Sequence, residues 1–304
     1  MKKTLSFFLK LAVSAGLLFY LFRHTDFRLL WQSFKQIKLS WFWLAVLFFF
    51  AFQLLSTYRW YKIAETLGFK KGYLFFVRVY FIGVYFNTFL PGLLGGDIVR
   101  VFYLVKEGAA KSVASFSVLY DRGFGLLGAL FLLIVFLPLE GAFLPPLAQR
   151  GLLFLSVAIL AAVLVVVLFS RPLREKIGHE LFQTLTAVAP PANFAKLFIL
   201  GLLVQVFYNV HVYFLGLSLG LSLTWPKYFL IIPLMGILAS LPVSLGGFGI
   251  REGTLSYFLQ LLGYPKELGI ALGFLIYGVM LLGGIIGGIL YLTGPRGLKG
   301  SPNG

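Results

Sequence analysis

The sequence contains no cysteine, which excludes disulfide bonds and thiolate metal sites. Its three histidines are scattered through the chain without the spacing of metal ligands. Charged residues are scarce as well, because they make up 12% of the chain and only 10 of them are acidic. No module that combines basic and aromatic residues for nucleic-acid binding is visible. We therefore expect no metal, no cofactor and no nucleic-acid partner.

Apolar residues dominate the chain. Of its 304 residues, 60% are hydrophobic, far above the share in a soluble domain. The apolar runs are too long for barrel strands, and a backbone in lipid must satisfy its polar groups within its own segment, so the runs should be helices. The net charge of +16 suggests basic cytoplasmic loops that face anionic headgroups. The composition thus predicts an all-α polytopic membrane protein.

One stretch occurs twice, at Leu90–Arg100 and at Leu241–Arg251, and both copies have the pattern L-P-x-x-L-G-G-x-x-x-R without a gap. Proline ends a helix, and a glycine pair allows backbone angles that other residues avoid. The arginine follows where a new helix would begin. Each copy therefore predicts a helix broken inside an apolar region, and matching breaks in two halves of a membrane protein are typical of a transport site. Two ordinary surface turns are the alternative.

The apolar runs predict about six full spans and two broken elements in one membrane domain, residues 1–295, with a flexible tail at 296–304. The spans cover approximately residues 6–22, 41–58, 113–137, 151–169, 196–219 and 268–292, and the broken elements cover 73–105 and 225–262. If both broken elements are re-entrant, the three spans between them make the two hairpins enter from opposite faces. Repeat 1 (about 41–138) and repeat 2 (about 196–292) then form an inverted repeat. Eight spans, with each broken element crossing completely as two, stay open.

Basic residues set the predicted orientation. With the N-terminus inside, the basic loop that starts at Arg59 and the basic loop with Arg171 and Arg174 lie in the cytoplasm, as does the C-terminus. Residues 27–37 have the periodicity of an amphipathic helix lying in the interface, with a loop as the alternative.

Three acidic residues fall inside apolar stretches: Asp97, Asp121 and Glu252. Each has an arginine close in sequence, which predicts the pairs Asp97–Arg100, Asp121–Arg122 and Glu252–Arg251. A charged side chain at the centre of an inserted helix costs about 2.5–3.5 kcal/mol, so such pairs should face a cavity or each other. An intramembrane ionisable residue is a functional-site hypothesis by default.

The chemistry indicated is anion binding. After each glycine pair a short helix is predicted, about 98–105 and 250–262, whose first amides lack partners and carry the positive end of the dipole. A phosphate fits there, and Arg100 and Arg251 add forked donors. No residue is expected to be catalytic. The candidate substrate-binding residues are Asn87, Pro91, Gly95, Gly96, Asp97, Arg100, Asp121, Arg122, Gly246, Gly247, Arg251 and Glu252.

Structural roles are the alternative for several of these residues. Asp97 can cap its helix and pair with Arg100 on the next turn. Asp121 and Arg122 can form a structural pair at the cytoplasmic end of a span. Asn87 can cap the broken helix instead of contacting a ligand.

Four segments resemble the signature of a known family: Asn87–Pro91, Gly95–Arg100, Asp121–Arg122 and Gly246–Gly253. They are similar to the flippase-like membrane domain, the transmembrane part of lysyl-phosphatidylglycerol synthases, which also occurs as a stand-alone protein. The resemblance covers about residues 5–295. It implies a protein of the bacterial or archaeal cytoplasmic (inner) membrane that moves a lipid between leaflets. The soluble aminoacyl-transferase domain of the bifunctional relatives is expected to be absent here.

The leading hypothesis is a lipid translocase, not an enzyme, that moves an anionic or phosphate-bearing lipid between the leaflets. A membrane phospholipid or a lipid-linked phosphate is the expected partner, and homo-oligomers stay open. The second hypothesis is an integral-membrane transferase acting on a lipid phosphate, with Asp97, Asp121 and Glu252 as acid and base, although no nucleophile–base arrangement is visible. The third is a transporter of small ions or solutes.

Overall fold

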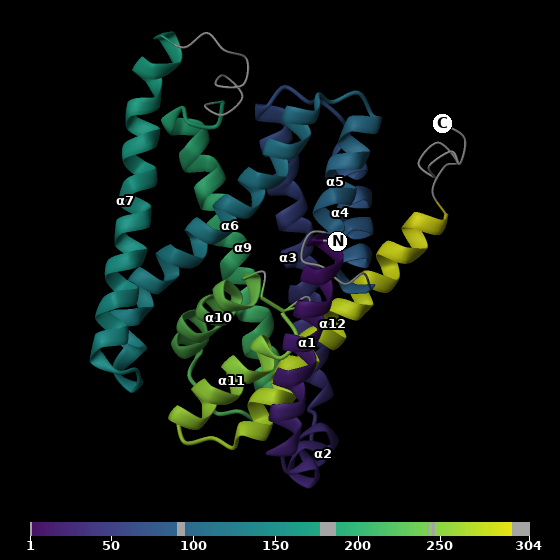
Figure 1. Cartoon of the computed structure of the whole chain (residues 1–304), viewed down its shortest axis with the longest axis vertical. Helices are drawn as coiled ribbons and strands as arrows, with labels where there is room; N and C mark the ends of the chain where they lie inside the picture. The colour runs from purple at the N-terminus through teal and green to yellow at the C-terminus, as the bar shows by residue number, and fades with distance from the viewer. Residues whose placement is uncertain (1, 90–94, 177–186, 242, 245–246, 294–304) are drawn as a thin grey trace.

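Five long apolar helices form the frame of the protein. The computed structural model describes residues 2–89, 95–176, 187–241, 243–244 and 247–293. Within these ranges five helices are long and apolar enough to cross a membrane, and no strand is found. They are α3 (Leu39–Thr66), α6 (Lys111–Glu140), α7 (Pro146–Lys176), α9 (Pro191–Ser218) and α12 (Lys266–Leu292). The all-α polytopic membrane fold is therefore confirmed, as Figure 1 shows.

Each predicted broken element consists of two short helices. The first contains α4 (Tyr73–Phe89) and α5 (Gly95–Lys106), and the second contains α10 (Trp225–Ser240) and α11 (Ile250–Leu261). The members of each pair pack against each other. The 12 residues of α5 or α11 rise about 18 Å, less than the thickness of a bilayer core. In Figure 1, α4 and α5 occupy the upper half of the molecule, and α10 and α11 occupy the lower half.

The long helices hold the two pairs in equivalent surroundings. At the centre, α3 packs along α9. Around this core, α4 packs on α3 and α12, and α10 packs on α9 and α6. Likewise α5 packs on α6, and α11 packs on α12. Every contact of the first pair therefore has a counterpart in the second when α3 is exchanged with α9 and α6 with α12.

Glycine allows the closest of these approaches. A Cβ atom on Gly287 of α12 would lie 1.9 Å from the backbone oxygen of Phe81 in α4. No side chain fits at such a distance, so the α4–α12 contact requires a residue without one. Small residues at interfaces are the usual way to bring membrane helices together, since lipid provides no hydrophobic force between them.

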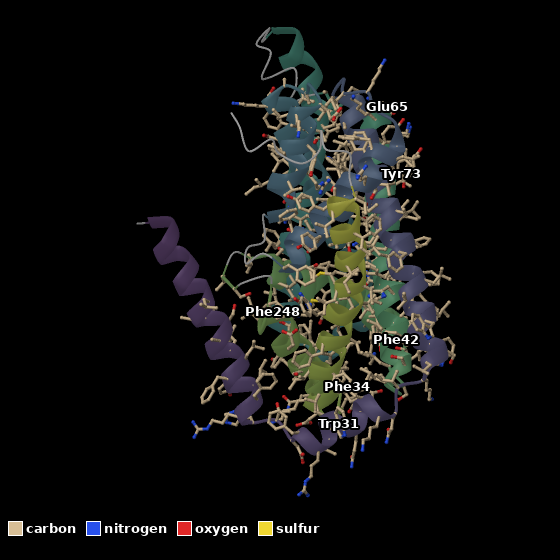
Figure 2. All side chains as sticks on the ribbon, turned by 90° about the vertical axis from the view of Figure 1, so that its right-hand side faces the viewer. Trp31, Phe34, Phe42, Glu65, Tyr73 and Phe248 are labelled. Atoms are coloured by element: carbon tan, nitrogen blue, oxygen red, sulfur yellow. The ribbon has the colours of Figure 1, made fainter. Side chains whose placement is uncertain are left out.

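Two N-terminal helices border this bundle. Figure 2 shows α1 (Lys2–Arg23) standing apart from it; α1 contacts α11, and at its end Phe22 stacks on Phe274 of α12. The apolar stretch of α1 whose side chains the structure describes, Leu11–Arg23, is shorter than a span, so the first span stays a prediction. The expected amphipathic segment is the helix α2 (Phe27–Lys35), whose first turn is capped by Asp26 through an Oδ1 that accepts from Arg28 N at 2.8 Å.

Three predicted boundaries were wrong. Arg59 lies inside α3, not in a loop, because the helix continues to Thr66. The span predicted to end at residue 137 continues to Glu140, with Pro138 in the last turn of α6. The segment with Arg171 and Arg174 belongs to α7, which runs to Lys176. The predicted tail, 296–304, lies outside the described residues.

Replacing Gly287 by valine should disrupt the fold, because the new side chain would overlap the backbone of α4. Overpacking of this kind costs about 3 kcal/mol or more. Gly278 of the same helix is the matched control, since a Cβ atom there meets nothing within 4 Å. In thermal unfolding of the detergent-purified protein, Gly287→Val should lower the midpoint or prevent folding, while Gly278→Val stays near the wild type. Equal midpoints for both variants would contradict this account of the packing.

Candidate functional site

A buried network of ion pairs joins three helices. Asp121 of α6 accepts from Arg59 Nε of α3 at 2.8 Å and from an Nη of Arg100 of α5 at 2.7 Å. Asp97 of α5 lies 3.6 Å from another Nη of Arg100 and accepts from Arg122 Nε of α6. We call these five residues the ion network. Its three guanidinium groups face two carboxylates, which leaves one excess positive charge.

Helix geometry explains why the partners differ from those predicted. Asp97 and Arg100 are three residues apart and share one face of α5, so their predicted pair is confirmed. Asp121 and Arg122 are adjacent and point about 100° apart on α6. The predicted Asp121–Arg122 pair was therefore wrong, because Asp121 turns to Arg59 and Arg100 while Arg122 reaches Asp97.

Aromatic rings enclose Arg100. Its guanidinium carbon lies 4.1 Å from the ring centre of Trp60 and 4.8 Å from that of Tyr80. Trp60 is held in turn by a hydrogen bond from its Nε1 to Ser117 Oγ at 3.1 Å. Cation–π contacts stabilise a desolvated cation by up to about 2 kcal/mol. Arg100 is 6% exposed, so ion pairs and rings together replace its hydration.

The first helix break is closed by Asn87. Its Oδ1 accepts from Gly96 N at 2.7 Å, so the alternative role of Asn87 as a cap is what the structure shows. A Cβ atom on Gly96 would lie 2.2 Å from Gly83 O, which makes glycine necessary for the approach of α4 to α5. The helix α5 begins at Gly95, earlier than the predicted residue 98, so Arg100 lies in its second turn.

The second break uses glycine differently. Gly247 and Gly249 have φ angles of 78° and 81°, a region that favours glycine, and α11 follows directly. Glu252 Oε2 accepts from Gly249 N at 2.8 Å. Its other oxygen is buried and accepts no hydrogen bond from any described residue. The predicted Glu252–Arg251 pair stays a prediction.

Each cap occupies one backbone amide at its helix break. The amides of Gly96 and Gly249 already donate to Asn87 and Glu252, so they are not open to a phosphate. Anion binding by the other first amides of α5 and α11 stays a prediction, and the guanidinium groups of Arg100 and Arg251 are further candidate donors. Pro91 and Gly246, which were also expected to contact substrate, lie outside the described residues.

One cavity brings the arginines of both motif copies together. It has a volume of about 430 Å³, and Arg100, Arg122 and Arg251 line it together with Asn87 and His211. Arg251 is 7% exposed. His211 is held in place by a hydrogen bond between its Nδ1 and Ala45 O at 2.8 Å. We call this the arginine cavity.

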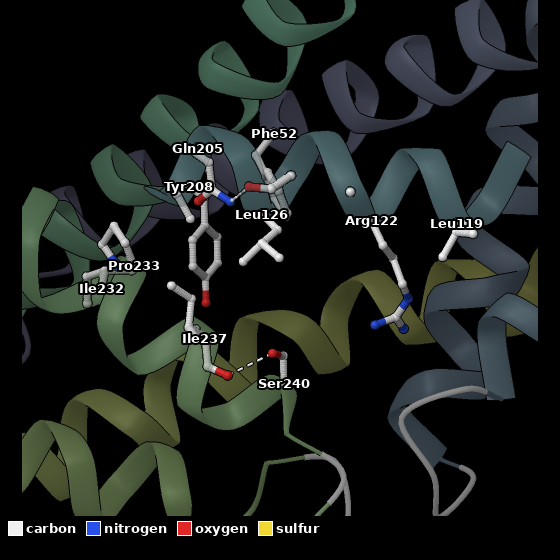
Figure 3. Close-up of a pocket in the computed structure, with 14 residues that line it drawn as sticks. Phe52, Leu119, Arg122, Leu126, Gln205, Tyr208, Ile232, Pro233, Ile237 and Ser240 are labelled. Atoms are coloured by element: carbon white, nitrogen blue, oxygen red, sulfur yellow. Dashed lines mark hydrogen bonds between the residues drawn. The ribbon is translucent and has the colours of Figure 1, made fainter. Parts of the chain in front are cut away.

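A second cavity adjoins the first. It has a volume of about 490 Å³ and lies between α6, α9 and α10, where Leu126, Ile232 and Ile237 contribute apolar walls. Phe52, Arg122 and Tyr208 line both cavities. Figure 3 shows Arg122 and Tyr208 projecting into this space from α6 and α9. We call this the apolar cavity.

Arg59 is the member of the ion network that sequence reasoning missed. Its position in a run of basic residues after an apolar segment is typical of a cytoplasmic loop, yet its side chain is 6% exposed. The signal was indirect, because Asp121 needs a partner and its neighbour Arg122 points elsewhere. Among the described residues, no group of three or more His, Cys, Asp or Glu side chains could hold a metal ion.

Long apolar helices, together with charges buried among them, define a multi-pass α-helical membrane protein. A family model described as "Lysylphosphatidylglycerol synthase TM region" matches residues 7–288. The chain belongs to this family, which confirms the resemblance and indicates a lipid-related function in the membrane. A search of curated proteins found no match.

Asp121 should be the most important carboxylate for stability. Removing the charge from one partner of a buried ion pair costs about 3–5 kcal/mol, because the remaining charges lose their compensation. Asp121→Asn should thus lower the thermal midpoint strongly. Glu107→Gln is the matched control, since Glu107 pairs with Lys71 at the surface, where such pairs contribute about 1 kcal/mol or less. A midpoint for Asp121→Asn equal to that of Glu107→Gln would show that the ion network is not structural.

Proposed function

We propose that this protein moves a phosphate-bearing lipid between the two leaflets of the membrane without covalent chemistry. The observation that carries the proposal is the arginine cavity, in which Arg100 of the first motif copy and Arg251 of the second face one space. Guanidinium groups bind phosphate oxygens through paired donors, and they keep their charge at every physiological pH.

Charge and burial support an anionic ligand. The three guanidinium groups of the ion network outnumber its two carboxylates, and both Arg100 and Arg251 are at most 7% exposed. A positive charge buried in an apolar protein is costly unless an anion neutralises it. A lipid phosphate that enters the arginine cavity would supply that neutralisation.

The adjoining apolar cavity supports a lipid over a soluble anion. An acyl chain needs an apolar path beside the headgroup site, and the apolar cavity shares Phe52, Arg122 and Tyr208 with the arginine cavity. At its edge Leu119 and Leu126 are 59% and 43% exposed, so this cavity opens toward the surface that faces lipid. A small-ion transporter would have no use for such a space.

We infer further that the two helix pairs are re-entrant hairpins of an inverted repeat. Their positions in opposite halves of the molecule and their equivalent packing on α3, α6, α9 and α12 support this inference. Hairpins that enter from opposite leaflets would give a headgroup one route from each side to the same arginines. Alternating access in many transporters depends on such a relation.

The proposed setting is the cytoplasmic membrane. Two connections are basic, the one between α3 and α4 and the one between α5 and α6, and both would face the cytoplasm under the positive-inside rule. The α4–α5 hairpin would therefore enter from that side. Both termini would then be cytoplasmic, as expected from the sequence. The substrate would be a membrane phospholipid or a lipid-linked phosphate.

Lipid movement should depend on the cavity arginines. In proteoliposomes with fluorescently labelled phosphatidylglycerol, dithionite quenching measures how fast lipid changes leaflets. Arg100→Gln and Arg251→Gln should each slow this exchange about tenfold or more, because each removes charge-assisted hydrogen bonds to the phosphate. Arg28→Gln, on an exposed residue of α2, is the matched control and should behave as the wild type.

The proposal fails if wild-type protein does not accelerate exchange above empty liposomes. It also fails if folded Arg100→Gln and Arg251→Gln variants both retain the wild-type rate. Formation of a new product from labelled lipid would instead favour the transferase hypothesis.

A further inference from the structure

We propose that Asp97 is a built-in competitor of the substrate: its carboxylate occupies Arg122 until the phosphate of an entering lipid takes its place. This inference rests on the proposed function and names the residue that the lipid phosphate engages first. Asp97 acts through Arg122, so it is a positioning residue.

The two carboxylates of the ion network are held differently. Asp121 bonds Arg59 at 2.8 Å and Arg100 at 2.7 Å, and the side chains of both arginines are 7% exposed or less. Asp97 bonds Arg122, whose side chain is 41% exposed, and it lies 3.6 Å from Arg100. Both partners in the Asp121 pairs are thus buried, whereas in the Asp97–Arg122 pair the arginine side chain is exposed.

Arg122 lies where an entering lipid phosphate would meet it first. Arg122 is the charged residue among those that line the apolar cavity, and it also lines the arginine cavity. A lipid whose acyl chain enters between α6 and α10 brings its phosphate to Arg122 before it reaches Arg100 or Arg251. Figure 3 shows the side chain of Arg122 projecting from the same side of α6 as Leu119 and Leu126, into this space.

The exchange leaves no buried charge without a partner. A phosphate and a carboxylate accept from the same donors of a guanidinium group, so one can replace the other on Arg122. Asp97 keeps Arg100 within 3.6 Å when it releases Arg122. The step therefore avoids the large penalty of stranding a carboxylate in an apolar interior. When the phosphate leaves, Asp97 returns to Arg122 and favours release.

This arrangement predicts opposite effects on binding for the two partners. Asp97→Asn removes the competitor, so an anionic lipid should bind more tightly while exchange between leaflets slows, because release is no longer assisted. Arg122→Gln removes the receptor, so binding should weaken. A purely structural ion pair would weaken binding in both variants.

The test measures the Kd of fluorescently labelled phosphatidylglycerol for detergent-purified full-length protein, with labelled diacylglycerol of the same chains as the uncharged control. Asp97→Asn should bind phosphatidylglycerol about tenfold more tightly, and Arg122→Gln about tenfold more weakly, the change expected for one charge-assisted interaction. The double variant should behave as Arg122→Gln. Binding of diacylglycerol should not change in any variant.

Equal or weaker phosphatidylglycerol binding by folded Asp97→Asn overturns the inference. If Asp97→Asn does not fold, the Arg122→Gln variant provides the test. Unchanged phosphatidylglycerol binding by Arg122→Gln would show that Arg122 does not receive the phosphate and would overturn the inference. The proposed function fails separately, when wild-type protein shows no preference for phosphatidylglycerol over diacylglycerol and no acceleration of exchange.

Discussion

The structure depends on one constraint: a charge placed among apolar helices must be neutralised where it lies. Lipid offers no water to Arg59, Arg100 or Asp121, so their ion pairs at 2.7 and 2.8 Å provide the solvation they lack. Because the partners come from α3, α5 and α6, this requirement also fixes how the short α5 sits against the long helices. The same network that stabilises the fold thereby holds Arg100 at the wall of a cavity.

The two helix breaks reach a similar result by different means. In the first, Gly96 lets α4 and α5 approach so closely that a Cβ atom would lie 2.2 Å from Gly83 O. In the second, Gly247 and Gly249 adopt positive φ angles that turn the chain into α11. One side chain caps each break, Asn87 at the first and Glu252 at the second, and the guanidinium groups of Arg100 and Arg251 lie beside these caps at one cavity. Fixed, permanently charged donors beside an apolar cavity form a surface suited to a molecule that is anionic at one end and apolar at the other.

The hydropathy pattern and the repeated motif were sufficient to predict the helices and the two breaks. In lipid the backbone must satisfy itself within each segment, so local sequence determines local structure more strictly than in water. The motif also identified Arg100 and Arg251, since proline, paired glycines and arginine at fixed spacing combine a break with a charge. The predicted start of α5 at residue 98 was wrong, because the helix begins at Gly95 and so includes the glycine pair.

The sequence by itself therefore determined the membrane class, most of the helices and the two breaks, and it singled out Arg100 and Arg251 as candidate residues while Arg59 was missed. Only the tertiary structure decided which acidic and basic side chains form ion pairs. Asp121 and Arg122 are neighbours in sequence but point about 100° apart on α6, and Arg59 is buried because α3 continues past the apolar run and packs beside α6. The meeting of Arg100 and Arg251 at one cavity is likewise a consequence of packing, since α5 is held against α6 and α11 is held against α12.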